Sequence, residues 1–182
     1  MKTFFQSLAD IERYIDPYQR AYALRCKHCD AQGHLIGHGF IYKQVSMLKR
    51  NVVGKHLVCS NRFGHTGCGR TVQLLLAEQL PNRQYGAIQL SVFILLLLAN
   101  VSVVTAYQQA TGQVSTRHAW RWLNALKASL MYYRLLITSP PPIRYQHARS
   151  QHPIWSALAA LCATLTGEVC LAFQLQTQID FI

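Results

Sequence analysis

Apolar residues near the N-terminus recur at helical spacing until Pro17 ends the pattern. The positions that share one face are Phe4, Leu8, Ile11 and Ile15. This spacing predicts a helix within residues 1–21 that packs on the domain after it. A helix that binds a partner protein is the alternative.

A different pattern follows, because residues 34–45 and 51–58 are rich in β-branched, aromatic and glycine residues. Such segments are typical of short strands. Residues 70–76 continue the pattern and predict a third strand. The region from residue 22 to residue 79 is therefore expected to form a small antiparallel β-ribbon.

Beyond Pro81 the pattern becomes helical and predicts three helices, over residues 85–99, 103–110 and 117–127. Ser102 is the expected N-cap of the second helix, and Gly112 suits the positive φ of its C-cap. Ser115 or Thr116 is expected to cap the third helix. Small Ala106 lies where the second and third helices would touch. Residues 80–138 therefore have the pattern of a helix-turn-helix, with a plain three-helix bundle as the alternative.

Three consecutive prolines in residues 140–142 cannot lie inside a helix, so residues 139–152 are expected to form a basic, extended linker. In residues 153–182 an apolar stripe predicts a C-terminal amphipathic helix. Its residues are Ile154, Leu158, Leu161 and Leu165. The stripe either folds back on the preceding helices or mediates contact with a second copy or a partner.

Six cysteines occur in the chain, and four of them have spacings typical of a metal site. Cys26 and Cys29 form a Cys-x2-Cys motif, whose tight turn suits two corners of a zinc tetrahedron. Cys59 and Cys68 are expected to supply the other two corners, although their x8 gap is unusual. His65 is an alternative to Cys59 as the fourth ligand, and buried thiols without a metal are a further alternative. We expect one Zn²⁺ and a fold that is mainly α with a small β zinc ribbon.

The chain carries a net charge of +11, and between residues 31 and 167 its only acidic residue is Glu78. A surface with so few acids indicates a polyanionic partner, either nucleic acid or an anionic membrane surface. Candidate phosphate contacts on the ribbon are Lys43, Lys49, Arg50, Lys55, Arg62 and Arg70. Candidate DNA contacts on the third helix are Thr116, Arg117, His118, Arg121 and Asn124. Arginine and asparagine can each bridge two groups on a base edge in the major groove.

A cysteine ribbon that leads directly into a helix-turn-helix resembles the DNA-binding region of bacterial insertion-sequence transposases and their accessory proteins. The resemblance covers residues 22–127 and rests on Cys26-x2-Cys29, on residues 56–71 and on residues 104–126. It implies zinc-dependent, sequence-specific binding of double-stranded DNA in a mobile element, with a transposase or a second copy as partner. The x8 gap departs from the usual pattern, and residues 140–182 match nothing in it.

Catalysis of strand transfer needs clustered carboxylates, and only Glu168 and Asp180 follow the helix-turn-helix. We therefore expect a binding module rather than an enzyme. A stand-alone transcriptional repressor, and a structural zinc protein that binds RNA or an acidic protein, are the alternatives. The N-terminus has no secretory signal pattern, and the apolar run of residues 90–99 is too short for a membrane span. The expected location is cytoplasmic and nucleoid-associated, without a membrane partner.

Overall fold

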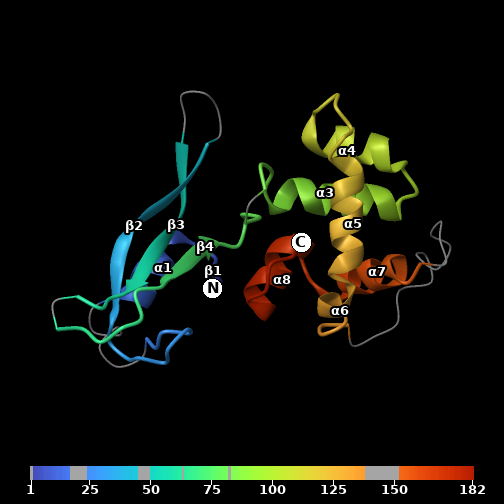
Figure 1. The fold of residues 1–182 in the computed structure, drawn as a ribbon. Helices are drawn as coiled ribbons and strands as arrows, with labels where there is room; N and C mark the ends of the chain where they lie inside the picture. Colours follow the sequence, from blue (N-terminus) through green and yellow to red (C-terminus); the bar gives the residue numbers. More distant parts are fainter. Residues whose placement is uncertain (1, 17–23, 45–49, 63, 82, 138–151) are drawn as a thin grey trace. The chain divides into compact units, whose positions relative to one another are not determined.

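The computed structural model of the chain describes residues 2–16, 24–44, 50–62, 64–81, 83–137 and 152–182. It divides into two compact units, Met1–Ala77 and Glu78–Ile182. The first unit carries the sheet and the second is helical (Figure 1). The protein is thus a mixed α/β protein, in which a four-stranded sheet with a cluster of cysteines is followed by helices.

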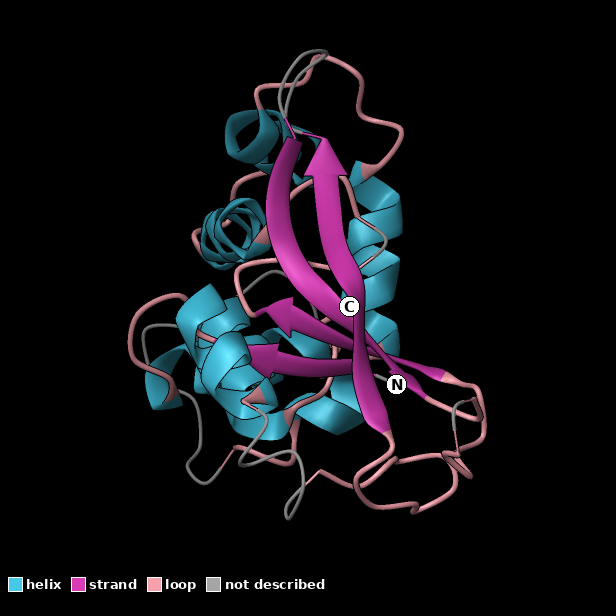
Figure 2. Cartoon of the chain, turned by 90° about the vertical axis from the view of Figure 1, so that its left-hand side faces the viewer, coloured by secondary structure: helices cyan, strands magenta, loops and turns pink. Residues whose placement is uncertain are grey.

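The first unit is a mixed sheet with the strand order β1-β4-β3-β2. Its strands are β1 (Lys2–Phe5), β2 (Leu35–Gln44), β3 (Arg50–Cys59) and β4 (Thr71–Leu76). Strands β2, β3 and β4 pair antiparallel, as the sequence predicts for the ribbon, and β1 joins the far edge parallel to β4. Figure 2 shows β2 and β3 as long curved strands that run beyond the two shorter ones.

The prediction of one N-terminal helix is wrong at its start. Lys2–Phe5 form β1, in which Phe4 pairs with Leu75 of β4, and helix α1 covers only Leu8–Ile15. Ser7 separates the two elements, because its hydroxyl accepts a hydrogen bond from the Asp10 N–H while the Asp10 carboxylate accepts one from the Ser7 N–H. This reciprocal capping box defines where the helix begins.

The core of the first unit is small, and cysteines form part of it. Its fully buried members include Ile11 of α1 and Leu57 and Leu74 of the sheet, together with Cys26 and Cys59. Few apolar side chains thus separate α1 from the sheet. A unit with so little buried apolar surface depends on a further source of stability, such as a metal.

The second unit contains the described helices α3 (Ala87–Leu98), α4 (Val103–Thr111), α5 (Ala119–Ala128), α6 (Leu130–Tyr133), α7 (Ile154–Thr164) and α8 (Val169–Thr177). Two predicted caps are confirmed: the Ser102 hydroxyl accepts from the Thr105 N–H, and Gly112 ends α4 with a φ of +68°. The predicted cap of α5 is wrong. His118 rather than Ser115 or Thr116 is its N-cap, and its side chain makes no capping hydrogen bond.

Helices α3, α4 and α5 pack around a cluster of aromatic rings. Trp122 of α5 lies edge-on to Tyr107 of α4 and to Phe93 of α3, at ring-centroid distances of 5.2 and 5.3 Å. Ala106 is fully buried in the same core, as its small size predicts. The segment from Gly112 to His118 is longer than the three or four residues typical of a helix-turn-helix turn. Val114 within it is 87% exposed and does not contribute to the core.

The apolar stripe of the C-terminal segment lies inside the helical unit. Ile154, Leu158, Leu161 and Leu165 are all 4% exposed or less and belong to the same core as α3, α4 and α5. The stripe therefore folds back, and it does not present an exposed face. The predicted linker falls almost wholly in residues 138–151, outside the described part of the chain.

Of the helices that the structure describes, none is long and apolar enough by itself to cross a membrane. Helices α7 and α8 pass that test only as a pair, with a bend of 82° between them.

Candidate metal centre

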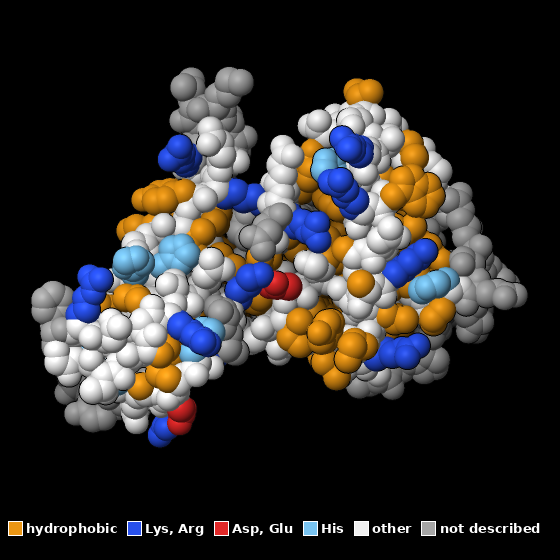
Figure 3. Space-filling view, in the orientation of Figure 1, with side chains coloured by type: hydrophobic (Ala, Val, Ile, Leu, Met, Phe, Trp, Pro, Cys, Tyr) orange, Lys and Arg blue, Asp and Glu red, His pale blue; other side chains and the backbone are white. Residues whose placement is uncertain are grey.

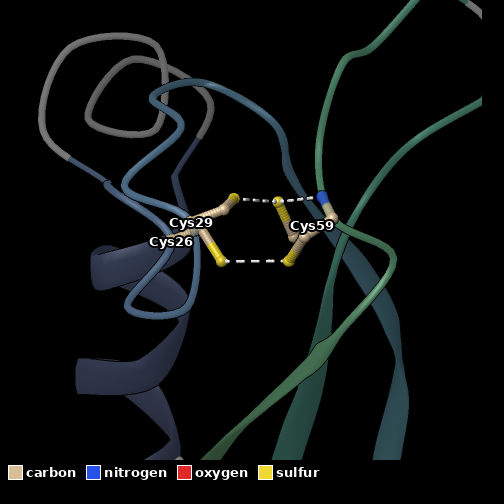
Figure 4. A group of neighbouring side chains, drawn as sticks. Cys26, Cys29 and Cys59 are labelled. Atoms are coloured by element: carbon tan, nitrogen blue, oxygen red, sulfur yellow. Dashed lines mark hydrogen bonds between the residues drawn. The ribbon is translucent and has the colours of Figure 1, made fainter.

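Four cysteine sulfurs from three segments of the first unit lie within 4.8 Å of one another. Cys26 and Cys29 lie on the turn that precedes β2, Cys59 ends β3, and Cys68 lies in the loop before β4. Figure 4 shows the thiols of Cys26 and Cys29 pointing across toward the strand that carries Cys59. The sheet thus brings together residues that are far apart in the sequence.

The sulfur separations match a zinc tetrahedron. Four thiolates about 2.3 Å from one Zn²⁺ stand about 3.8 Å apart at the corners of a regular tetrahedron. The separation is 3.7 Å both between Cys26 Sγ and Cys68 Sγ and between Cys29 Sγ and Cys59 Sγ. A disulfide would bring two sulfurs to about 2.05 Å. The cluster is therefore consistent with a metal such as zinc, held by all four cysteines.

Backbone groups of both loops support the sulfurs. The His28 N–H donates to Cys26 Sγ over 3.4 Å, and the Cys68 N–H donates to Cys59 Sγ over 3.3 Å. The first loop closes where the Asp30 N–H donates to the Cys26 carbonyl, with Asp30 at a φ of +58°. These donors stabilise negative charge on sulfur, as structural metal sites require.

Gly67 is a supporting residue that the spacing of cysteines did not reveal. Its N–H donates to the Ser60 carbonyl over 2.8 Å, which draws the second loop against the end of β3. A Cβ at this position would lie 2.6 Å from Cys59 Sγ and would also collide with the Ser60 carbonyl oxygen. Only glycine allows the backbone to pass this close to the cluster.

Cys26 and Cys59 differ in the pKa of their thiols when no metal is bound. Burial raises the pKa of the Cys59 thiol, the hydrogen bond from the Cys68 N–H lowers it by less, and hydrogen bonding with the neighbouring thiols raises it again, to about 12. Burial also raises the pKa of Cys26, but hydrogen bonds from the backbone of His28 and Cys29 and from the thiols of Cys59 and Cys29 outweigh it and lower the pKa to about 7. A metal that enters at neutral pH therefore has to displace protons.

His65, the predicted alternative ligand, lies outside the cluster of sulfurs that the described residues form. Its Nδ1 instead forms a hydrogen bond of 3.1 Å with His34 Nδ1, and the two rings stand edge to face. The geometry therefore favours Cys59 over His65 as the fourth ligand.

Three of the six predicted phosphate contacts on the ribbon lie on the surface. Arg50, Arg62 and Arg70 are exposed, whereas Lys49 falls outside the described residues. Lysine and arginine side chains are scattered over the face drawn in Figure 3, where few acidic side chains are visible. Lys43 is half-buried and makes other contacts.

Lys55, one of the predicted phosphate contacts, has an acidic neighbour in the fold. Its Nζ lies 2.6 Å from Glu12 Oε1 of α1 and 4.7 Å from the centre of the Phe40 ring, and its side chain is only 17% exposed. Lys55 therefore joins α1 to the sheet, and it is a weaker candidate for a phosphate contact than the exposed arginines.

The predicted DNA contacts of the helical unit form one exposed face of α5 and the segment before it. Arg117, His118, Arg121 and Asn124 are exposed, and Thr116 is half-buried. No acidic residue lies in the first turn of α5. Arg83, which was not among the predicted DNA contacts, lines a pocket together with His118 and Arg121.

No protein-family model, curated protein or solved structure matches this chain. The resemblance to transposase DNA-binding regions therefore does not place this chain in a family.

Proposed function

We propose that the chain is a zinc-stabilised protein that binds double-stranded DNA through α5. The observation that carries the proposal is a group of exposed side chains, Arg121 and Asn124 of α5 together with Arg117 in the turn just before the helix. All three are exposed, and no acidic residue accompanies them in the first turn. Arg121 and Asn124 are three residues apart on α5, so they lie on the same face of the helix and can enter the major groove together.

The neighbouring elements support the role of α5. Helix α4 packs beside it and ends at Gly112, while buried Trp122 anchors α5 to α3 and α4 through ring contacts. The inner face of α5 is thus held rigidly, and its outer face stays free for a ligand. This is the division of roles in a helix-turn-helix, here with a longer connection between the two helices.

The metal centre serves folding rather than catalysis in this proposal. Four cysteines complete a tetrahedron and leave no open position for a substrate, as in structural zinc sites. Since Cys26 and Cys59 belong to the small core of the first unit, metal binding supplies part of its folding free energy. Exposed Arg50, Arg62 and Arg70 then place positive charge on a stable ribbon.

A binding module rather than an enzyme agrees with the distribution of acids. The whole chain has seven Asp and Glu residues. Among the described residues, the only group of potential metal ligands with three or more members is the cysteine cluster. We propose a role beside a catalytic partner, either as a transposase accessory protein or as a repressor. Terminal inverted repeats and a transposase gene next to the coding sequence would favour the first role.

Selection of bound duplexes from a random pool, with the zinc-loaded full chain, tests the proposal. We expect an enriched sequence whose affinity falls steeply with salt, because bound phosphates release counterions. Asn124→Ala should weaken binding to that sequence by about 1–3 kcal/mol and relax the choice at one base position. A chain that binds random and selected duplexes equally, with no effect of Asn124→Ala, would refute base recognition by α5.

A second candidate function is binding of RNA, and two exposed aromatic residues of β2 favour it. Phe40 is 45% and Tyr42 is 57% exposed, and their rings form an edge-to-face pair. Exposed aromatic rings beside cations are typical of surfaces that stack single-stranded bases. Under this alternative, Tyr42→Ala should weaken binding of single-stranded RNA, while Asn124→Ala should leave it unchanged.

A further inference from the structure

A pocket with a volume of about 230 Å³ lies beside the first turn of α5, within the helical unit. Two separate segments form it. Arg83, Gln84 and Tyr85 come from the loop before α3, and His118, Arg121 and Trp122 come from the start of α5. The volume is several times the roughly 30 Å³ that one water molecule occupies in the liquid. The pocket has room for an anion the size of a phosphate and for its water molecules.

The walls of this pocket carry positive charge without a counter-charge. Two arginines and a histidine line it, and no acidic residue does. Neither Arg83 nor Arg121 forms an ion pair with a residue that the structure describes. Two guanidinium groups that line one pocket repel each other. An anion between them would be attracted by both, and this attraction would offset the repulsion.

The remaining walls suit a ligand that is charged at one end. Trp122 is only 3% exposed, and its ring stands edge to face with the Tyr85 ring at a centroid distance of 5.7 Å. These contacts hold the aromatic wall of the pocket in place. His118 and Arg121 are exposed, so the basic part reaches the surface. The first turn of α5 adds the positive end of a helix dipole, without an acidic side chain to neutralise it.

We propose that this pocket binds a phosphate group, held between Arg83 and Arg121. Planar guanidinium groups bind phosphate through paired hydrogen bonds, which two lysines could not reproduce. The inference rests on the proposed function in one respect: the phosphate is taken to belong to the backbone of the DNA that α5 reads. Arg83 thereby becomes a DNA contact that lies outside the recognition helix.

The pocket also changes the role of Arg121. A guanidinium that binds a backbone phosphate recognises no base, because every nucleotide carries the same phosphate. Base recognition then falls to Asn124 of α5 and to Arg117 just before the helix, which are exposed and do not line the pocket. The contact between Arg83 and the phosphate would fix the register of α5 in the groove.

The test compares Arg83→Ala with a control, Arg134→Ala, in the zinc-loaded full chain. Arg134 is an exposed arginine at the end of α6 that does not line the pocket. Fluorescence anisotropy would measure the affinity for the selected duplex and for a scrambled one between about 50 and 200 mM salt. Arg83→Ala should weaken both complexes about tenfold and lower the salt slope by about one. Arg134→Ala should leave both affinities unchanged.

A second measurement separates the pocket from DNA binding. In the wild-type chain, pyrophosphate should shift the indole N–H signal of Trp122 in a saturable way, and Arg83→Ala should abolish the shift. Arg83→Lys, which keeps the charge and loses the planar fork, should restore only part of the affinity. Circular dichroism of the variants confirms that the helices are intact.

The outcomes distinguish the two proposals. Binding of pyrophosphate without any binding of duplex supports the pocket and overturns the proposed function. A chain that binds duplex equally well with and without Arg83, at every salt concentration, overturns the pocket and leaves the function standing. A loss confined to the selected sequence also overturns it, because a phosphate contact acts on all sequences alike.

Discussion

Replacement of Gly67 by alanine tests the geometry of the metal centre with a single methyl group. The backbone of Gly67 is not in the left-handed region, so alanine causes no strain in φ there. The added Cβ would, however, lie 2.6 Å from Cys59 Sγ, and ordinary contact begins at about 3.4 Å. The substitution therefore perturbs the site through close contact alone.

The size of the effect follows from these distances. To relieve the contact with the sulfur alone, the loop or the sulfur has to move by about 0.8 Å, which is the difference between the two separations, and the Ser60 carbonyl oxygen, only 2.3 Å from the added Cβ, has to move as well. Metal–ligand distances in a sound site vary by only about 0.2 Å. Because the required shift is about four times this tolerance, we expect Gly67→Ala to lower zinc affinity by about 10–100-fold, as loss of a supporting group does elsewhere.

Competition with a coloured chelator measures this affinity, and Gly37→Ala provides the matched control. Gly37 lies on β2 at an ordinary φ, and a Cβ there would meet nothing within 4 Å. The control should retain wild-type zinc affinity, while Gly67→Ala should lose zinc at lower chelator concentrations and unfold the first unit earlier on heating. Equal zinc affinity for Gly67→Ala, Gly37→Ala and the wild type would refute the close packing of this loop against Cys59.

Three further predictions concern the metal and the C-terminal segment. Cys29→Ser should lose zinc and the folded sheet, while His65→Ala should keep both, as metal analysis and circular dichroism will show; zinc retained in Cys29→Ser would contradict the ligand set. Zinc affinity should fall as pH falls, because burial raises the pKa of Cys59 to about 12 in the metal-free site and protons compete with the metal; affinity that is independent of pH in chelator titrations would contradict this. Leu158→Ala should destabilise the helical unit by about 2–5 kcal/mol, because Leu158 is fully buried; denaturant unfolding measures this, and an unchanged midpoint would place the side chain at the surface.

The cysteine cluster was predictable from the sequence, because the spacing within a Cys-x2-Cys pair is itself a signal for a metal site. Cys26 and Cys29 share one turn, and a second pair of cysteines after two strand-like segments can close the tetrahedron only if the strands form a hairpin. The sequence left the fourth ligand undecided between Cys59 and His65, because spacing alone does not distinguish them. The tertiary structure favours Cys59, because His65 forms a hydrogen bond with His34 instead.

The parallel strand β1 was not predictable from periodicity. Phe4 fits the helical spacing of Leu8 and Ile11, and yet it lies in a strand, because pairing with β4 overrides the local pattern. A local signal was nevertheless present: Ser7 followed three residues later by Asp10 is a helix start. The added strand makes the first unit a mixed sheet rather than a simple ribbon.

The basic residues show most clearly what a sequence leaves undecided. Lys55 and Arg121 both looked like free cations, because no acid lies near them in the sequence. The fold separates them: Lys55 is paired with Glu12 of α1, while Arg121 shares a pocket with Arg83 and has no acidic partner among the described residues. Our proposal is that these two arginines are held for a ligand that carries the opposite charge. Under the proposed function, the net charge of +11 predicts an anionic partner, and the absence of an acidic neighbour among the described residues predicts which arginines that partner meets.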